Sequence, residues 1–173
     1  YKGNLMHKVH TLIGRTEHIQ AILELKKAKT AQMVVCQGRR RIGKSYLIRH
    51  IGSQWPHYIE IQGLAPHPQI SNQDQLDSFM KKLSEQTGLP NSTMKDWDSA
   101  FRLLGKFFED KTAFIFLDEI SWLGGEDPLF CGTLKTLWDT LFSKNKKLVL
   151  VLCGSVSSWI ENNILQNTNF LGR

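Results

Sequence analysis

The residues with the clearest chemistry are eight consecutive positions, Gly38, Arg39, Arg40, Arg41, Ile42, Gly43, Lys44 and Ser45. They form a complete G-x-x-x-x-G-K-[ST] pattern between two apolar runs, residues 33–36 and 46–48. Backbone N–H groups at a helix N-terminus bind phosphate, and glycines let the backbone approach closely. Lys44 would reach the β- and γ-phosphates of a triphosphate, and the Ser45 hydroxyl would bind Mg²⁺. The alternative is an ordinary glycine-rich turn beside a basic run.

Two adjacent acids, Asp118 and Glu119, follow a continuous apolar run at residues 112–117. Such a run is typical of a strand buried on both faces of a parallel sheet. The chain turns where a strand ends, so both carboxylates can approach the phosphate groove. Asp118 would hold Mg²⁺ together with Ser45. Glu119 would orient and deprotonate the attacking water, a role that typically contributes ~10²–10⁴ in rate. Two solvated acids at a strand terminus are the alternative.

Three further residues are candidates at the same site. Ser155 follows an apolar run at residues 147–153 and could touch the γ-phosphate or the water. It could equally cap a helix that begins at Val156, and one hydroxyl could serve both roles. Tyr46 directly follows Ser45, and we include it among the nucleotide-binding residues. Arg173 could supply positive charge for the transition state, or it could simply be the last residue of the sequence.

The hydrophobic pattern predicts the elements that position these groups. Apolar runs predict four strands, at residues 32–37, 57–62, 112–117 and 147–153. Helical spacing predicts helices at residues 16–28 and 44–51, from Ser71 or Asn72 to near Gly88, and around the stripes at residues 97–108 and 134–142. This alternation indicates right-handed crossovers and a parallel sheet covered on both faces. We therefore expect a single α/β domain over residues 1–173.

The composition limits the function classes. The net charge of +6 suits an anionic ligand or partner, but it is spread in small basic groups, at residues 26–29, 39–41 and 144–147. Nucleic acid stays open as a partner, although no base-reading element accompanies the charge. The three cysteines, Cys36, Cys131 and Cys153, form no C-x-x-C pair, which favours reduced thiols in a cytoplasmic protein. Cys36 and Cys153 lie in apolar runs, which favours burial of these two. The longest apolar run is too short to span a bilayer, so we expect no membrane partner.

Together these motifs resemble the prokaryotic, archaeal-type P-loop ATPases, which are related to AAA+ proteins and lie near the STAND NTPases. The resemblance covers nearly the whole chain, and it includes the loop at residues 38–45 together with residues 12–15, 117–122, 152–158 and 170–173. It implies a three-layer, AAA+/ASCE-like P-loop NTPase fold that binds ATP with Mg²⁺. It also implies the first sensor role for Ser155 and places Gly14 and Arg15 near the adenine.

Two departures from the family pattern lead to further expectations. Thr16 stands where the family commonly has glutamate, which affects the base pocket. AAA+ sheets usually have five strands in the order 5-1-4-3-2, followed by a helical lid, whereas the pattern here predicts four strands and no lid. The strand at residues 32–37 would then be an exposed edge. We therefore expect the N-terminal part of a larger protein, with its C-terminal region as the missing partner, prone to homo-oligomerisation or aggregation and weakened in nucleotide affinity.

These observations predict a Mg²⁺-dependent ATPase core that acts as a motor or switch. A nucleotide-gated scaffold with negligible turnover and a P-loop kinase for a small molecule are the alternatives, and stimulation by nucleic acid is a variant of the first. ATP is favoured over GTP by the family resemblance and because the sequence contains no Asn-Lys-x-Asp motif.

Overall fold

The computed structural model describes residues 9–12, 17–38, 43–155 and 158–165. Its strands are β1 (Val9–Leu12), β2 (Gln32–Gly38), β3 (His57–Gln62), β4 (Ala113–Asp118) and β5 (Leu148–Ser155). Its helices are α1 (Glu17–Glu24), α2 (Lys44–Gly52), α3 (Asn72–Thr87), α4 (Trp97–Phe108), α5 (Ile120–Gly124), α6 (Phe130–Thr140) and α7 (Ser158–Ile160). Short 3-10 turns occupy Leu25–Lys27 and Phe142–Lys144, and one π-helical turn occupies Glu161–Leu165.

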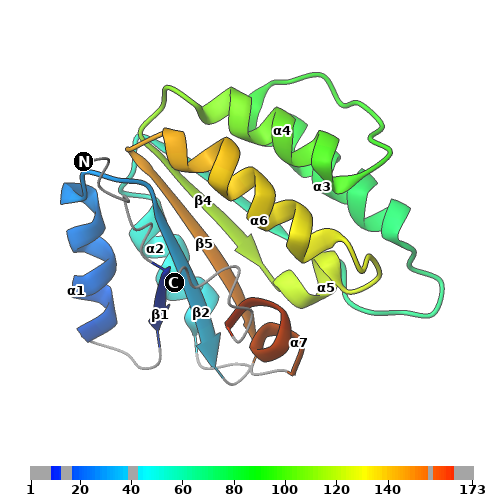
Figure 1. Ribbon diagram of the computed structural model, residues 1–173, viewed down its shortest axis with the longest axis horizontal. Helices are drawn as coiled ribbons and strands as arrows, with labels where there is room; N and C mark the ends of the chain where they lie inside the picture. Colours follow the sequence, from blue (N-terminus) through cyan, green and yellow to red (C-terminus); the bar gives the residue numbers. More distant parts are fainter. Residues whose placement is uncertain (1–8, 13–16, 39–42, 156–157, 166–173) are drawn as a thin grey trace, which may run out of the picture.

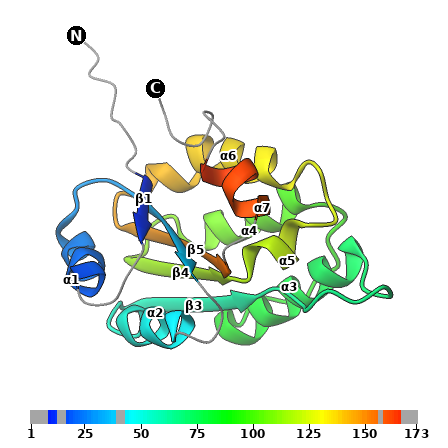
Figure 2. The ribbon, with the colours of Figure 1, turned by 90° about the horizontal axis from the view of Figure 1, so that it is seen from below.

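The described strands form one parallel sheet in the order β1-β2-β5-β4-β3 (Figure 1). Helices cover both faces, and Figure 2 shows α6 and α2 on opposite sides of the sheet. Strands β4 and β5 are buried along almost their whole length, because a parallel sheet covered on both faces leaves no side of a central strand to water. The predicted three-layer α/β fold is confirmed.

Alternate residues of each strand enter two separate cores. On one face Val34, Phe116 and Val151 pack with residues of α1 and α2. On the other face Val35, Leu117 and Leu152 pack with helices α3 to α7. This alternation follows from the two-residue period of a strand, which sends neighbouring side chains to opposite faces.

Local signals define the helices that form the larger core. Ser71 and Asp74 make a capping box at the start of α3, in which the Ser71 hydroxyl accepts from the Asp74 N–H. Hydrogen bonds from Ser71 lower the pKa of the Asp74 carboxyl. The Asp96 carboxylate accepts from the Ser99 N–H at 2.8 Å and so caps α4. The predicted helices at these positions are confirmed, with boundaries that the caps explain.

The prediction of four strands is wrong, because β1 adds a fifth strand from the N-terminal part of the chain. It pairs in parallel with β2, from Val9 opposite Met33 to Leu12 opposite Cys36. The edge of β2 that we expected to be exposed is therefore covered over these four positions. The order of the other four strands, β2-β5-β4-β3, is the one that the AAA+ resemblance implies. The expected aggregation and oligomerisation followed from an open edge, and the pairing of β1 removes that basis. The weakened nucleotide affinity was also expected from a missing lid, and it stays a prediction.

Other features differ less from expectation. The first helix ends at Glu24 and continues as a 3-10 turn, while its proposed cap, Thr16, lies outside the described residues. The short helix α5 after Glu119 was not predicted. Cys36 and Cys153 are buried, as predicted, and Cys131 is buried as well, with its pKa raised by burial to about 12. In the part of the chain described, no helix combines the length and apolar character needed to cross a bilayer.

An aromatic cluster joins α3, α4 and α6 in the larger core. Phe101 is fully buried, with its ring centroid 5.6 Å from that of Phe79, 5.4 Å from Trp97 and 5.5 Å from Phe130. The Trp97 indole N–H donates to the Asn72 side-chain oxygen at 2.8 Å, so the one polar atom of this ring has a partner. The stripe at residues 97–108 is therefore core packing.

We predict that Phe101→Ala lowers the free energy of unfolding by ~3–5 kcal/mol, because it removes apolar contacts and leaves a cavity. Urea denaturation measures the change. Arg102→Ala is the matched control, since Arg102 forms only an exposed ion pair with Asp98, and it should cost at most ~0.5 kcal/mol. Equal losses in the two variants would contradict this account of the core.

Candidate active site

Parallel pairing brings the ends of β2, β4 and β5 to the same edge of the sheet. Gly38, the last residue of β2, lies opposite Ser155, the last residue of β5. Leu117, one residue before the acidic pair, lies opposite Leu152 of β5. The arrowheads of β2 and β4 accordingly point the same way in Figure 1. The glycine-rich motif and the acidic pair therefore meet at this edge, although they are far apart in the sequence.

Gly43 begins the helix that follows the glycine-rich motif. Its backbone is left-handed, with φ of 82°, a conformation that glycine adopts without the penalty that a Cβ would impose. Its carbonyl accepts the Leu47 N–H at 3.0 Å, which starts the hydrogen bonding of α2. Lys44 and Ser45 consequently occupy the first turn of α2, where N–H groups lie unused by the helix and the helix dipole favours an anion.

The Lys44 side chain turns back toward the end of β2. Its Nζ donates to the carbonyl oxygen of Gly38 at 2.5 Å, so the ammonium lies at the last residue of β2. An ammonium carries three N–H donors and no acceptor, so oxygen acceptors such as those of phosphate are its natural ligands. Lys44 and Ser45 are both partly accessible. The motif thus presents a cation and a hydroxyl side by side at the helix start.

A tight turn holds the acidic pair at the end of β4. Asp118 is only 4% exposed, and its Oδ1 accepts the Glu119 N–H at 2.9 Å. Glu119 has φ of 50°, the one positive value at a non-glycine residue among the described positions. Such a conformation is uncommon outside glycine and is found where surrounding structure enforces it. Here the Glu119 carbonyl accepts the N–H groups of Trp122 and Leu123, at 2.9 and 3.2 Å, which begins α5.

One cavity of about 380 Å³ joins the two motifs. Its described walls are Gly43, Lys44, Ser45, Tyr46, Asp118, Glu119, Trp122 and Gly154. The Tyr46 side chain is 73% exposed at its rim. The residues that line the cavity therefore bring together one cation, two hydroxyl groups and two carboxyl groups, with the rings of Tyr46 and Trp122 beside them.

Six of the predicted site residues line this cavity. The others either do not line it or lie outside the residues that the structure describes. Ser155 is not among the described lining residues, whereas its neighbour Gly154 is. A Cβ on Gly154 would lie 2.4 Å from Cδ1 of Ile160, so the side chain of Ile160 in α7 packs closely over this glycine. The following predicted residues lie outside the described ranges: Gly14, Arg15, Arg39, Arg40, Arg41, Ile42 and Arg173. The proposed capping role of Ser155 involves residues 156 and 157, which also lie outside them.

Trp122 and Gly154 are lining residues that the sequence interpretation did not select. Trp122 comes three residues after Glu119, which places both on one side of the first turn of α5. Recognising that short helix would have identified Trp122. Gly154 directly follows a predicted strand. A glycine at such a position looks the same in the sequence whether it lines a cavity or only ends the strand, so Gly154 could not be selected.

Two thiols lie under the site, on neighbouring strands. Cys36 of β2 is the register partner of Cys153 of β5. A hydrogen bond between the two side chains lowers the pKa of Cys36 and raises that of Cys153, and burial raises the pKa of Cys153 further. Lys44 and Asp118 are close enough to influence both thiols electrostatically. The site thus has an apolar, closely packed base formed by the central strands.

The donors in the cavity suit a hard divalent cation. Ser45 supplies a hydroxyl oxygen and Asp118 a carboxylate, and Mg²⁺ prefers oxygen ligands together with water and phosphate oxygens. The Oδ1 atom of Asp118 accepts one backbone N–H, and its carboxylate has further acceptor capacity. Among the described residues, no group of three or more His, Cys, Asp or Glu side chains forms an all-protein metal site. These residues fit a cation that arrives with a phosphate ligand.

The sheet order, the helix that begins at Gly43-Lys44-Ser45 and the acids after β4 define a P-loop NTPase of the AAA+ class. The family model described as "AAA domain" matches residues 26–158, which is most of the chain. The chain belongs to this family.

Comparisons with individual proteins agree with this assignment. The chain is 26% identical over 155 residues to the uncharacterized protein MJECL04 of Methanocaldococcus jannaschii, covering 88% of this chain and 31% of that protein. The fold resembles the Walker-type ATPase PABY2304 of Pyrococcus abyssi, with a TM-score of 0.60, 18% identity and coverage of 93% of this chain and 51% of that one. It also resembles the ORC2 protein of Aeropyrum pernix, solved as ADPNP–ADP complexes, with a TM-score of 0.55, 14% identity and coverage of 99% and 49%. The chain thus spans about a third to a half of these proteins.

Gly63 shapes the acidic turn from outside the cavity. A Cβ at this position would lie 2.7 Å from the Leu123 backbone nitrogen and 2.9 Å from the Glu119 carbonyl oxygen. The end of β3 therefore packs directly against the backbone of the turn that carries Glu119. Only a residue without a side chain permits this contact.

We predict that Gly63→Ala lowers the free energy of unfolding by ~1–3 kcal/mol, because backbone atoms must move to admit the methyl group. Hydrogen exchange at the Leu123 amide should accelerate as well. The control is Gly132→Ala, since a Cβ at this exposed position of α6 meets no atom within 4 Å. That substitution should stabilise the protein by up to ~1 kcal/mol. A neutral effect of Gly63→Ala would refute the packing argument.

Proposed function

We propose that this chain binds ATP with Mg²⁺ and hydrolyses it to ADP and phosphate. The observation that supports the proposal is the cavity that joins Lys44 and Ser45 of α2 to Asp118 and Glu119 after β4. A triphosphate needs positive charge and N–H donors, and hydrolysis needs a base near the attacking water. This cavity contains residues suited to each task.

Binding of the triphosphate rests on the start of α2. The N–H groups of the first helical turn and the Lys44 ammonium would hold the phosphates, with Lys44 leaving the Gly38 carbonyl or sharing its protons with it. Ser45 and Asp118 would hold Mg²⁺, which neutralises charge on the phosphate oxygens when it is bound. Adenine nucleotide is favoured because the ORC2 neighbour is described with ADPNP and ADP.

Hydrolysis rests on Glu119. Its carboxylate would accept a proton from a water molecule as the water oxygen bonds to the γ-phosphorus, while the bond to the β-phosphate oxygen breaks and ADP leaves. The left-handed backbone of Glu119 directs the chain into α5, and the carboxyl group lies in the cavity wall that Lys44 shares.

In this proposal, the turnover of ATP serves an activity of a larger protein. The chain matches about a third of the length of MJECL04 and about half of the two similar structures. We infer that this ATPase core drives or switches an activity carried by a further, C-terminal region of the same protein. A nucleotide-gated scaffold remains the competing function, and measurement of turnover separates the two.

The test follows melting temperature and released phosphate while the chain is titrated with ATP, ADP or GTP and Mg²⁺. We expect stabilisation by ATP and ADP, weaker stabilisation by GTP, and phosphate release that requires Mg²⁺. Stabilisation without phosphate release, in this chain and in the full-length protein, would favour the scaffold. The absence of any stabilisation would overturn the proposed function.

Two substitutions should separate binding from chemistry. Lys44→Ala should abolish stabilisation by ATP, because it removes the cation at the phosphates. Glu119→Gln should keep ATP binding and slow phosphate release by ~10²-fold or more, because an amide cannot accept the proton. The controls are Lys95→Ala and Glu85→Gln, two exposed positions that do not line the cavity. Normal turnover in Glu119→Gln would show that another group is the base.

A further inference from the structure

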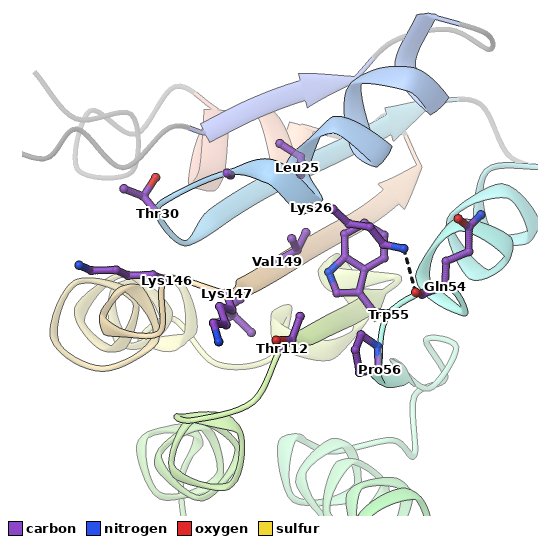
Figure 3. A pocket seen from close by; sticks show the side chains of 12 residues that line it. Leu25, Lys26, Thr30, Gln54, Trp55, Pro56, Thr112, Lys146, Lys147 and Val149 are labelled. Atoms are coloured by element: carbon purple, nitrogen blue, oxygen red, sulfur yellow. Dashed lines mark hydrogen bonds between the residues drawn. The ribbon is translucent and has the colours of Figure 1, made fainter.

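A second cavity lies at the opposite edge of the sheet, where the strands begin. Its volume is about 520 Å³, and its walls include Lys26, Thr30, Trp55, Thr112, Lys146 and Lys147. Figure 3 shows Lys26 and Gln54 on one side of the opening, Lys146 and Lys147 on the other, and Val149 between them. None of its lining residues belongs to the proposed ATP site.

The connections that lead into the strands concentrate positive charge around this cavity. Those entering β2, β3, β4 and β5 span residues 25–31, 53–56, 109–112 and 141–147. They carry seven lysines, at positions 26, 27, 29, 111, 144, 146 and 147. They carry only two acids, at positions 109 and 110. This surplus of five positive charges compares with a net charge of +6 for the whole chain. The amino edge of the sheet is therefore the basic edge.

The side chain of Lys26 and the backbone of Lys146 and Lys147 are held by contacts with neighbouring elements. Lys26 donates to the Gln54 carbonyl at 2.9 Å, and its Nζ lies 4.8 Å from the centre of the Trp55 ring. Lys146 and Lys147 follow the buried Asn145, whose amide donates to the carbonyls of Phe108 and Lys111 at 2.7 and 2.8 Å. Within the described residues, no salt bridge includes Lys26, Lys146 or Lys147. Their positive charge is thus positioned by the fold and not neutralised by a neighbouring carboxylate.

The chemistry of the cavity favours a polyanion over a base or an aromatic ligand. Trp55 is only 5% exposed, with Lys26 over its ring and the Phe114 ring centroid 4.9 Å away. Its faces are therefore not open for a base to stack. None of the described residues that line the cavity is an arginine, whose planar fork would recognise one phosphate or a guanine edge. Ammonium groups acting as separate point charges suit a row of phosphates.

We propose that this basic edge binds the phosphate backbone of a nucleic acid without sequence preference. Lysines stand on two sides of the cavity, so a chain of phosphates would contact more of them than one small phosphorylated molecule would. Hydroxyl groups of Thr30 and Thr112 could add neutral contacts to phosphate oxygens. The site lies at the end of the sheet away from Lys44, so nucleic acid and ATP would bind at the same time. This inference is independent of the proposed hydrolysis.

The test uses fluorescence anisotropy of a labelled DNA duplex of mixed sequence, measured over a series of NaCl concentrations. We expect affinity to fall linearly on a log–log plot, with no dependence on base sequence. Lys146→Ala/Lys147→Ala should weaken binding by about tenfold or more at low salt and reduce the salt slope by about two. The matched control is Lys81→Ala/Lys95→Ala, which removes equal charge from exposed positions outside this cavity and outside the connections that lead into the strands. The control should keep the wild-type slope.

Three results would overturn the proposal. One is the absence of binding to DNA at low salt. Another is an equal loss of affinity in the two double variants, which would mean that net charge alone attracts DNA. The third is displacement of the DNA by poly-glutamate as efficiently as by unlabelled DNA, which would favour an acidic polypeptide as partner. The melting temperature of each variant shows whether it is folded, so a loss of binding cannot be mistaken for unfolding.

Discussion

The whole arrangement depends on the parallel pairing of β5 with β2 on one side and β4 on the other. Val35, Leu152 and Leu117 form one row across these three strands. Because each of these strands packs against a core on both faces, a shift of one residue would exchange the side chains that fill the two cores and disrupt their packing. The same register holds the end of β2, and with it the start of α2, near the acids after β4. The strand between the two motifs therefore decides how far apart they lie.

Parallel strands also give the sheet two chemically different edges. At the carboxyl edge the chain supplies a helix start, a lysine, a serine and two acids around one cavity. At the amino edge it supplies mostly lysines, in connections that follow the ends of helices. The two edges are separated by the length of the buried strands. The same sheet thus has a cavity suited to a triphosphate at its carboxyl edge and a basic surface at its amino edge, and the two sites do not overlap.

Long elements and the main motifs could be predicted from the sequence, because each carries a strong local pattern. Strands such as β4 and β5 are uninterrupted apolar runs, and the α3 and α4 caps are visible as Ser71 and Asp96. Strand β1 was missed since four residues contain too few apolar positions to show a period. Helix α5 was missed for the same reason, and Trp122 with it. The left-handed backbone of Glu119 could not be predicted, because it results from packing of the turn against Gly63 and α5 and not from the preference of glutamate.

The most direct test of the central claim is an NMR titration of ¹⁵N-labelled protein with ADPNP and Mg²⁺. The claim is that the start of α2 and the end of β4 form one triphosphate site. It predicts that the amide signals of Gly43, Lys44, Ser45 and Glu119 shift together with a single affinity, while the amides of Trp55 and Lys147 at the other edge stay unchanged. Shifts confined to the basic edge, or shifts of α2 without any change at Glu119, would contradict it.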